Sequence, residues 1–130
     1  GLGDLAKVKE LLKKGREVNE RDSFGATPLL IAMVAGQEKM VELLLSRKAD
    51  PNINAREGYT LMHGAAFSGK KSMVSKALSL GLEINPRYGS DGITPTDVAE
   101  DEGDALPYLR ALGGRTAWEL GNLPEEPAGK

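Results

Sequence analysis

Apolar residues fall along the chain in short runs, and the runs come in pairs. Residues 29–35 are all apolar, Gly36 interrupts the chain, and residues 38–46 carry a second apolar stripe at helical spacing. The same arrangement returns over residues 61–80. A glycine between two helical stripes is typical of a turn. The pattern therefore predicts pairs of short helices joined by tight turns.

The landmark residues of these pairs repeat at a nearly constant spacing. Thr27 and Thr60 are 33 residues apart, and Thr60 and Thr94 are 34 residues apart. The first of these shifts also places Gly25 on Gly58, Ala32 on Ala65, Gly36 on Gly69, Val41 on Val74, Leu45 on Leu78 and Asn52 on Asn85. A fixed period of this length is the mark of a stacked repeat array.

The register divides the chain into repeats and a tail. It predicts a repeat domain over residues 1–115, with a partial repeat (1–20), three full repeats (21–53, 54–86 and 87–115) and a C-terminal tail (116–130). The partial repeat corresponds to the second helix of a pair. We therefore expect residues upstream of Gly1 to complete it.

The C-terminal part differs from the middle of the chain. The first helix of the last repeat is polar, and we expect Thr96, Asp97 and Asp101 to face water, as terminal repeats require for solubility. Thr116 echoes the start of another helix, but the prolines that follow exclude a regular second helix. We interpret the segment as a tail in which Trp118 folds back onto the last repeat and about six final residues are disordered.

Three positions carry specific backbone expectations. Thr27 and Pro28 form a helix start, because Thr caps the free amides and Pro suits the first helical position. Lys48 stands where the register predicts glycine, so we expect it to be left-handed at a cost of roughly 1 kcal/mol. Gly64 interrupts a predicted helix and is expected to mark a close contact with another helix.

Composition narrows the function classes. Hydrophobic residues make up 40% of the chain, enough for a core, and there is no cysteine for a disulfide or a Cys-based zinc site. The net charge of -2 argues against nucleic acid or an anionic membrane as partner. No apolar run approaches the ~20 residues of a membrane span. We expect a cytoplasmic monomer without a cofactor, with export left open because the chain begins midway through a repeat.

Catalysis is not expected. His63 is the single histidine, and nothing in the sequence joins it to Ser68 and Asp50 as a triad. Metal binding by one histidine and scattered carboxylates is equally weak. An enzyme would have to show turnover that disappears in His63→Ala while folding survives.

Three stretches resemble one known family. Asp22–Leu29 reads Asp-x-x-Gly-x-Thr-Pro-Leu, Val41–Leu45 reads Val-x-x-Leu-Leu, and Ala49–Asn52 reads Ala-Asp-Pro-Asn. With the recurring Ala and Gly residues, they resemble the ankyrin repeat over residues 3–114, about three and a half repeats.

This resemblance implies a fold and a surface. The fold is an all-α solenoid of stacked antiparallel helix pairs with hairpin finger loops, and the fingers and first helices form a concave face. The resemblance also implies that His63 hydrogen-bonds between neighbouring loops. Leu30 and Asp97 stand at the same position in the other repeats.

The family places its variable surface in the fingers and at the ends of the first helices. By register, the candidate protein-binding residues are Ser23, Phe24, Val34, Arg56, Glu57, Tyr59, Phe67, Tyr88, Asp91 and Asp101. Aromatic and Arg side chains dominate the binding energy of protein interfaces. The alternative is that the rings of Phe24, Tyr59 and Phe67 only pack between neighbouring fingers.

Residues 91–104 contain several acidic residues and no Lys or Arg. They form either a docking area for a basic partner surface, which would speed association at low salt, or a solvated capping face. The sequence therefore predicts a module that binds another protein, whose identity the residues leave open, without catalysis. The alternative is a structural spacer or capping fragment of a longer multidomain chain.

Overall fold

The computed structural model describes residues 6, 10, 17–99, 101 and 103–122. Its helices are α2 (Pro28–Val34), α3 (Glu38–Ser46), the 3-10 helix η1 (Arg56–Gly58), α4 (Leu61–Phe67), α5 (Lys71–Ser79), α6 (Pro95–Val98), α7 (Ala105–Ala111) and α8 (Ala117–Asn122). The described residues contain no β-strand, so the predicted all-α fold is confirmed. The helix expected in the partial repeat 1–20 falls mostly on residues outside the described part.

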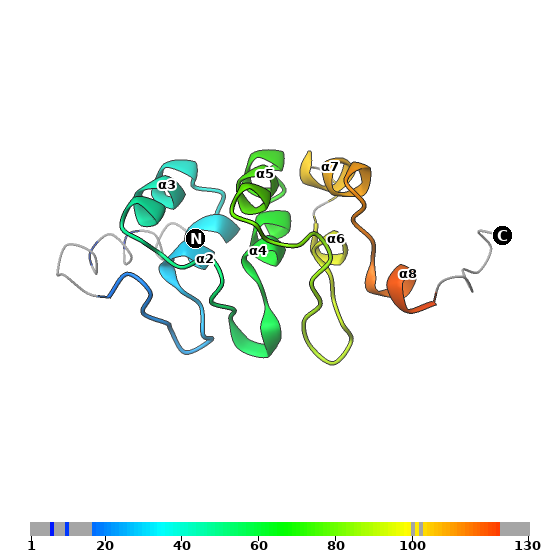
Figure 1. Ribbon diagram of the computed structural model, residues 1–130, viewed down its shortest axis with the longest axis horizontal. Helices are drawn as coiled ribbons and strands as arrows, with labels where there is room; N and C mark the ends of the chain where they lie inside the picture. The colour runs from blue at the N-terminus through cyan, green and yellow to red at the C-terminus, as the bar shows by residue number, and fades with distance from the viewer. Residues whose placement is uncertain (1–5, 7–9, 11–16, 100, 102, 123–130) are drawn as a thin grey trace.

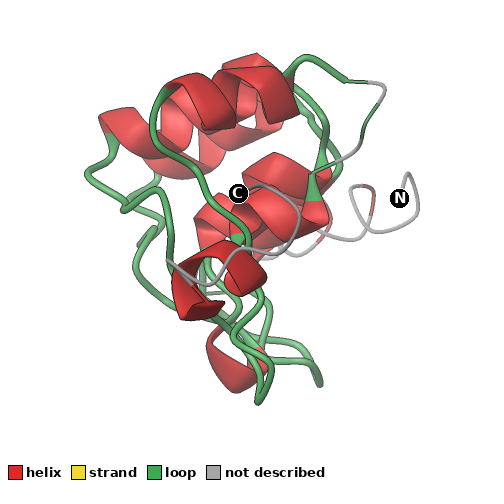
Figure 2. Ribbon diagram, turned by 90° about the vertical axis from the view of Figure 1, so that its right-hand side faces the viewer, coloured by secondary structure: helices red, strands yellow, loops and turns green. Residues whose placement is uncertain are grey.

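The helices form two rows, with loops projecting from one side. Helices α2, α4 and α6 make the inner row, and α3, α5 and α7 make the outer row (Figure 1). Each inner helix packs on the next inner helix and on its own outer partner. Seen along the rows, the long loops all project below the inner row (Figure 2). This is the stacked array of helix pairs that the period predicts.

Three threonines start the inner helices in the same way. Thr27, Thr60 and Thr94 are N-caps with extended backbone, and each side-chain oxygen accepts a hydrogen bond from the amide three residues on. Each cap satisfies an amide that the helix leaves free, which is worth about 1 kcal/mol. Their equivalent placement explains why the threonine spacing carries the period.

Leucine, methionine and valine side chains fill the space between the rows. Those with almost no exposed surface are Leu29, Met33, Val41, Leu44, Met62, Met73, Val74 and Leu109. Burying one such side chain stabilises the fold by about 1.5–3 kcal/mol. The core therefore runs the length of the stack, between the two rows of helices.

Gly64 lies at the closest approach of α2 and α4. A Cβ added to Gly64 would lie 2.7 Å from Leu30 Cδ1 and 3.1 Å from Val34 Cγ2. Both distances are shorter than the roughly 3.5–4.0 Å of favourable contact between carbon atoms. The predicted close helix contact at Gly64 is confirmed, and the contacting helix is α2.

Hydrogen bonds between backbones tie the projecting loops together. We call these loops finger 1 (22–26), finger 2 (55–59) and finger 3 (88–93). The Arg56 amide donates to the Phe24 carbonyl over 3.0 Å, and the Gly89 amide donates to the Glu57 carbonyl over 3.0 Å. Each finger is therefore held by its neighbour as well as by its own turn.

Two residues other than glycine have left-handed backbone. Lys48, with φ 70°, confirms the expectation from the register, and Gly81 at the equivalent place has φ 88°. Glu57, with φ 60° at the tip of finger 2, was not expected. A residue with a Cβ pays roughly 1–2 kcal/mol in this region, so both positions are strained.

Helix α8 occupies part of the segment that the sequence analysis assigned to a tail. The Glu119 amide donates to Thr116 Oγ1 over 3.1 Å, and the Thr116 amide donates to Glu119 Oε1 over 2.8 Å. The start of α8 therefore has the same reciprocal cap as the starts of α4 and α6. In addition, Thr94 Oγ1 donates to the carbonyl of Arg115, the residue just before Thr116 (2.6 Å).

The position of α8 shows that it is an inner helix without a finger. Thr94 and Thr116 are 22 residues apart, against 34 for Thr60 and Thr94. The shortened spacing leaves no room for a finger between α7 and α8. The Trp118 side chain remains 39% exposed, so it is covered only in part. The predicted disorder of the last residues falls on 123–130, outside the described part.

The polar face expected for α6 is correct for Asp97 and Asp101, which are exposed, and wrong for Thr96. Thr96 is only 4% exposed. The loop before α8 passes directly over it, because a Cβ on Gly114 would lie 2.6 Å from Thr96 Oγ1. Among the described residues this hydroxyl has no hydrogen-bond partner.

Candidate functional site

An apolar groove opens between fingers 1 and 2, on the side that faces the inner helices. It has a volume of about 370 Å³ and is lined by Phe24, Ala26, Leu30, Val34, Ala55, Arg56, Tyr59, Phe67 and Tyr88. We call it the aromatic groove. Its lining combines two inner helices, α2 and α4, with residues of all three fingers.

Two residues of α2, Leu30 and Val34, contribute to the lining. Leu30 stands at the position that His63 takes one repeat later, and its side chain is 4% exposed. Its Cδ1 lies in the space that a side chain at Gly64 would take. The floor therefore depends on a large residue on α2 and on the absence of a side chain on α4.

Phe24 and Arg56 form one rim of the groove. The Phe24 side chain is 67% exposed. Arg56 Cζ lies 6.0 Å from the centroid of the Phe24 ring, a cation–π distance. Arg56 Nη2 also donates to the Ser23 carbonyl over 3.4 Å. The guanidinium thus holds an aromatic ring in water at the tip of finger 1.

Phe67 is the last residue of α4 and also lines the groove. Its side chain is 48% exposed. A phenylalanine that packed fully between neighbouring elements would lose nearly all of its exposed surface. Phe24 and Phe67 therefore both present large apolar surfaces to solvent.

The rings of Tyr59, His63 and Tyr88 support the groove from behind. Tyr59 stacks on His63 with centroids 5.1 Å apart, and Tyr88 meets both rings edge-on at 4.9 and 4.8 Å. Burial, helped by the neighbouring Tyr88, raises the pKa of the Tyr59 phenol to about 12. This phenol therefore stays neutral and can donate a hydrogen bond at any physiological pH.

Hydrogen bonds fix the tautomer of His63. Nδ1 accepts from the Thr60 amide over 3.1 Å, so Nε2 carries the proton and donates to the Ile93 carbonyl over 2.7 Å. Burial lowers the pKa of His63, which keeps the ring neutral. His63 therefore links α4 to finger 3, as the resemblance implied, and both of its ring nitrogens are occupied.

Asp97 replaces this histidine in the last repeat and keeps the link to the next element. Its Oδ2 accepts from the Thr94 amide over 2.9 Å and from the Ala117 amide over 2.8 Å. Leu30 has no polar atom in its side chain and can make no such bond. The histidine position thus links neighbouring repeats in the third and fourth repeats and forms groove floor in the second.

Six of the ten candidate residues line the aromatic groove: Phe24, Val34, Arg56, Tyr59, Phe67 and Tyr88. The other four, which are Ser23, Glu57, Asp91 and Asp101, are exposed but do not line it. The sequence analysis missed Leu30, Ala26 and Ala55. A leucine in place of the expected histidine was the available signal for Leu30, because it predicts an apolar surface beside the fingers.

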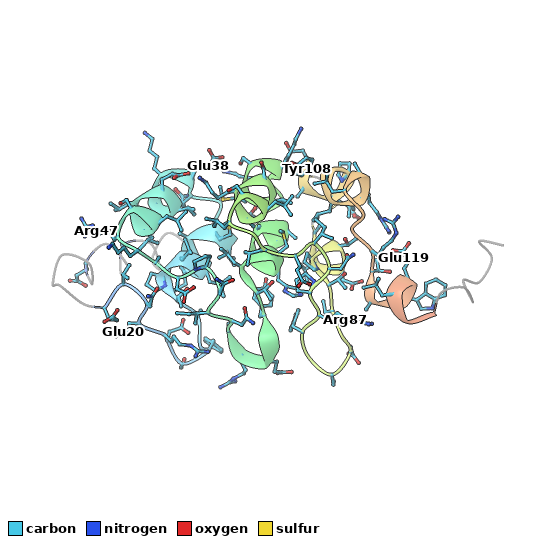
Figure 3. The ribbon with its side chains drawn as sticks, in the orientation of Figure 1. Glu20, Glu38, Arg47, Arg87, Tyr108 and Glu119 are labelled. Atoms are coloured by element: carbon cyan, nitrogen blue, oxygen red, sulfur yellow. The ribbon has the colours of Figure 1, made fainter. Side chains whose placement is uncertain are left out.

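The acidic stretch 91–104 is partly used by the fold. Asp97 binds backbone amides as described, and Asp104 Oδ1 accepts from the Lys71 amide at the start of α5. Arg87, beside finger 3 (Figure 3), donates through Nε to the Gly92 carbonyl over 3.3 Å and through Nη2 to the Ala117 carbonyl over 3.4 Å. Its guanidinium is therefore turned towards the backbone around finger 3 and α8.

The described residues offer no cluster of His, Cys, Asp or Glu that could hold a metal ion. The outer row carries a separate contact, in which Lys71 Nζ lies 5.0 Å from the ring of Tyr108, on α7 and far from the fingers (Figure 3). The arrangement of the groove can bury an apolar side chain and donate a few hydrogen bonds.

Stacked antiparallel helix pairs with one finger per repeat define a helical repeat array. A family model described as ankyrin repeats (3 copies) matches residues 2–110, and the chain belongs to the ankyrin-repeat family. Ankyrin repeats are protein-interaction modules and are in general not catalytic. None of the helices in the described part is long and apolar enough to cross a bilayer.

Similar proteins differ greatly in length. The chain is 33% identical over 115 residues to cyclin-dependent kinase 4 inhibitor B of Bos taurus, which covers 86% of each protein. It is 34% identical over 91 residues to NF-kappa-B inhibitor delta of Mus musculus, covering 69% of the chain and 28% of that protein. It is 44% identical over 82 residues to the inactive serine/threonine-protein kinase TEX14 of Bos taurus, covering 63% of the chain but 6% of that protein. The chain thus spans a small part of several relatives that it matches.

Proposed function

We propose that this chain binds another protein through its finger-side concave surface, with the aromatic groove at the centre of the contact. One observation carries the proposal: Phe24 and Phe67, which are 67% and 48% exposed, line the same groove. Large aromatic side chains dominate the binding energy at interfaces when a partner covers them. The remaining candidates, Ser23, Glu57, Asp91 and Asp101, would form the polar rim of this contact.

The mechanism is recognition by a preformed surface. The fingers are tied to each other by backbone hydrogen bonds, and the groove floor is packed against the inner helices. A surface that is ordered before binding loses little conformational entropy on association. Two relatives are named as inhibitors, which favours a role in which binding holds the partner in one state.

We infer that the chain performs no chemistry of its own. His63 spends one ring nitrogen on Thr60 and the other on Ile93, so it has no free nitrogen for proton transfer. The chain should also act as a monomer and bind neither nucleic acid nor membrane. Turnover of any substrate that is lost in His63→Ala, with folding retained, would refute this part.

A second candidate function is that of a structural spacer within a longer protein. It is favoured by the match to TEX14, of which the chain covers 6%. A spacer requires a folded array but makes no use of the exposed aromatic rings. The two functions therefore differ in whether loss of Phe24 and Phe67 affects capture of a partner.

The experiment compares two double variants in pull-downs from source cells. Phe24→Ala with Phe67→Ala removes both exposed rings, and Leu43→Ala with Leu112→Ala removes two exposed apolar side chains of the outer row (36% and 46% exposed). We expect the first pair to weaken capture about tenfold or more and the second to leave it unchanged. Helicity should be the same in both. Equal capture by both variants would mean that the proposed face is wrong.

A further inference from the structure

We propose that the partner segment recognised by this face is basic and carries one bulky apolar side chain. That side chain enters the aromatic groove, and the Lys or Arg residues beside it lie against the acidic tips of fingers 2 and 3. The inference rests on the proposed function, and it adds the chemistry of the partner to it.

The groove is suited to a single apolar side chain. Its volume of about 370 Å³ lies near the lower end of ligand pockets, which span roughly 300–1,000 Å³. Apart from the Arg56 guanidinium and two tyrosine hydroxyls, every lining side chain is a hydrocarbon. An aromatic or long aliphatic side chain would cover the exposed faces of Phe24 and Phe67 on entering. This burial provides affinity but does not distinguish one apolar segment from another.

A positive charge does not belong inside the groove itself. The Arg56 guanidinium already lies over Phe24 at its rim, and a second cation there would be repelled. The Tyr59 phenol is neutral, because burial raises its pKa to about 12, so it supplies no compensating charge. The basic residues of the partner must therefore lie beside the anchor, where the surface is acidic.

The tips of fingers 2 and 3 supply that acidic surface. Glu57 and Asp91 are exposed there, and Asp101 is exposed further along the inner row. The nearby bases are engaged, because Arg56 lies over Phe24 and Arg87 donates to carbonyls of Gly92 and Ala117. Residues 91–104 contain no Lys or Arg. The surface next to the groove is thus complementary to a basic segment.

Salt dependence separates the two parts of the contact. Attraction between exposed charges is screened beyond roughly 10 Å at 0.1 M salt, whereas burial of an apolar side chain is not screened. Removing the acidic tips should therefore matter at low salt, and removing an aromatic wall should matter at any salt. This difference gives the experiment its design.

The test starts from a random peptide library displayed on phage and selected against the intact chain. We expect enriched peptides to share one aromatic, Leu or Met residue flanked by Lys or Arg. One enriched peptide is then titrated by fluorescence anisotropy against the wild type, Phe67→Ser, and the double variant Glu57→Gln with Asp91→Asn. The controls are Leu112→Ser and Glu83→Gln, which make similar changes away from the groove.

We expect Phe67→Ser to weaken binding about tenfold or more at low and high salt. The double variant should weaken it severalfold at low salt and much less at high salt, with both controls unchanged. A consensus that lacks basic residues, or equal binding by the double variant and Glu83→Gln, overturns the inference.

Mapping by hydrogen exchange distinguishes this failure from failure of the proposed function. Uncharged or acidic peptides that protect the fingers and the ends of α2 and α4 overturn the basic partner but leave the binding face intact. Peptides that protect only the outer row, or no enrichment of any peptide, count against both.

Discussion

The contact between Gly64 and Leu30 allows a prediction about how two neighbouring repeats are coupled. Replacing a helical glycine by alanine normally stabilises a helix by about 1 kcal/mol. At Gly64 the new Cβ would lie 2.7 Å from Leu30 Cδ1 and 3.1 Å from Val34 Cγ2. Because Leu30 is 4% exposed and packed, it has little room to turn away. We expect Gly64→Ala to lower the free energy of unfolding.

The magnitude follows from two opposing effects. Overpacking a core by one methyl group costs typically about 1–3 kcal/mol, which exceeds the propensity gain of about 1 kcal/mol. Gly64→Ala should therefore destabilise the wild type by about 1 kcal/mol. Leu30→Ala alone should cost about 2–5 kcal/mol through the cavity it leaves. In that background Gly64→Ala should instead stabilise by about 1 kcal/mol, giving a coupling of about 2 kcal/mol.

The assay is urea unfolding of the four proteins, followed by circular dichroism. The slopes of the unfolding free energy against urea should agree, since a changed slope in a repeat array signals loss of two-state behaviour. If Gly64→Ala has the same effect with and without Leu30, the two residues do not compete for the same space. The account of the groove floor would then be wrong.

Three further predictions concern stability. Lys48→Gly should stabilise the fold by roughly 1 kcal/mol, because Lys48 has φ 70° and glycine is unstrained there; an unchanged or lower urea midpoint contradicts it. Thr96→Val should stabilise by about 1–3 kcal/mol by removing a buried hydroxyl that has no partner among the described residues, and a lower thermal midpoint would show that the hydroxyl is used. Burial lowers the pKa of His63, so the unfolded chain, with a pKa near 6.5, takes up the proton first. Stability should be constant above pH 6.5 and fall as the pH drops below it, and His63→Gln should abolish this slope while Lys48→Gly retains it.

The sequence was sufficient for the features that repeat. The threonine caps recur because every inner helix must satisfy the same free amides, and the left-handed Lys48 follows from the glycines at equivalent positions. Gly64 could be predicted to mark a close contact, since a glycine within a helix needs a reason. Its contacting residues, Leu30 and Val34, could not be named, because the register says which positions are equivalent but not which side chains meet across repeats.

The features that do not repeat were harder to predict. Thr96 is polar and was expected to face water, but the loop before α8 covers it, and that loop has no counterpart earlier in the chain. The left-handed Glu57 is invisible to a comparison with Phe24, one period earlier, because the two finger tips differ in backbone. Six candidate residues meet in one groove because Leu30 gives it an apolar floor, which depends on tertiary packing.

The missing finger before α8 sets a limit to the contact surface. Finger 3 is followed by an inner helix whose cap and hydrogen bonds match those of its predecessors, so the helical stack goes on while the row of tips stops. A ligand chain laid along the tips meets an edge after finger 3 and must bend toward α8 or leave the protein. Inserting a loop of finger length ahead of Thr116 is therefore the natural way to lengthen the reach of this molecule without rebuilding its framework.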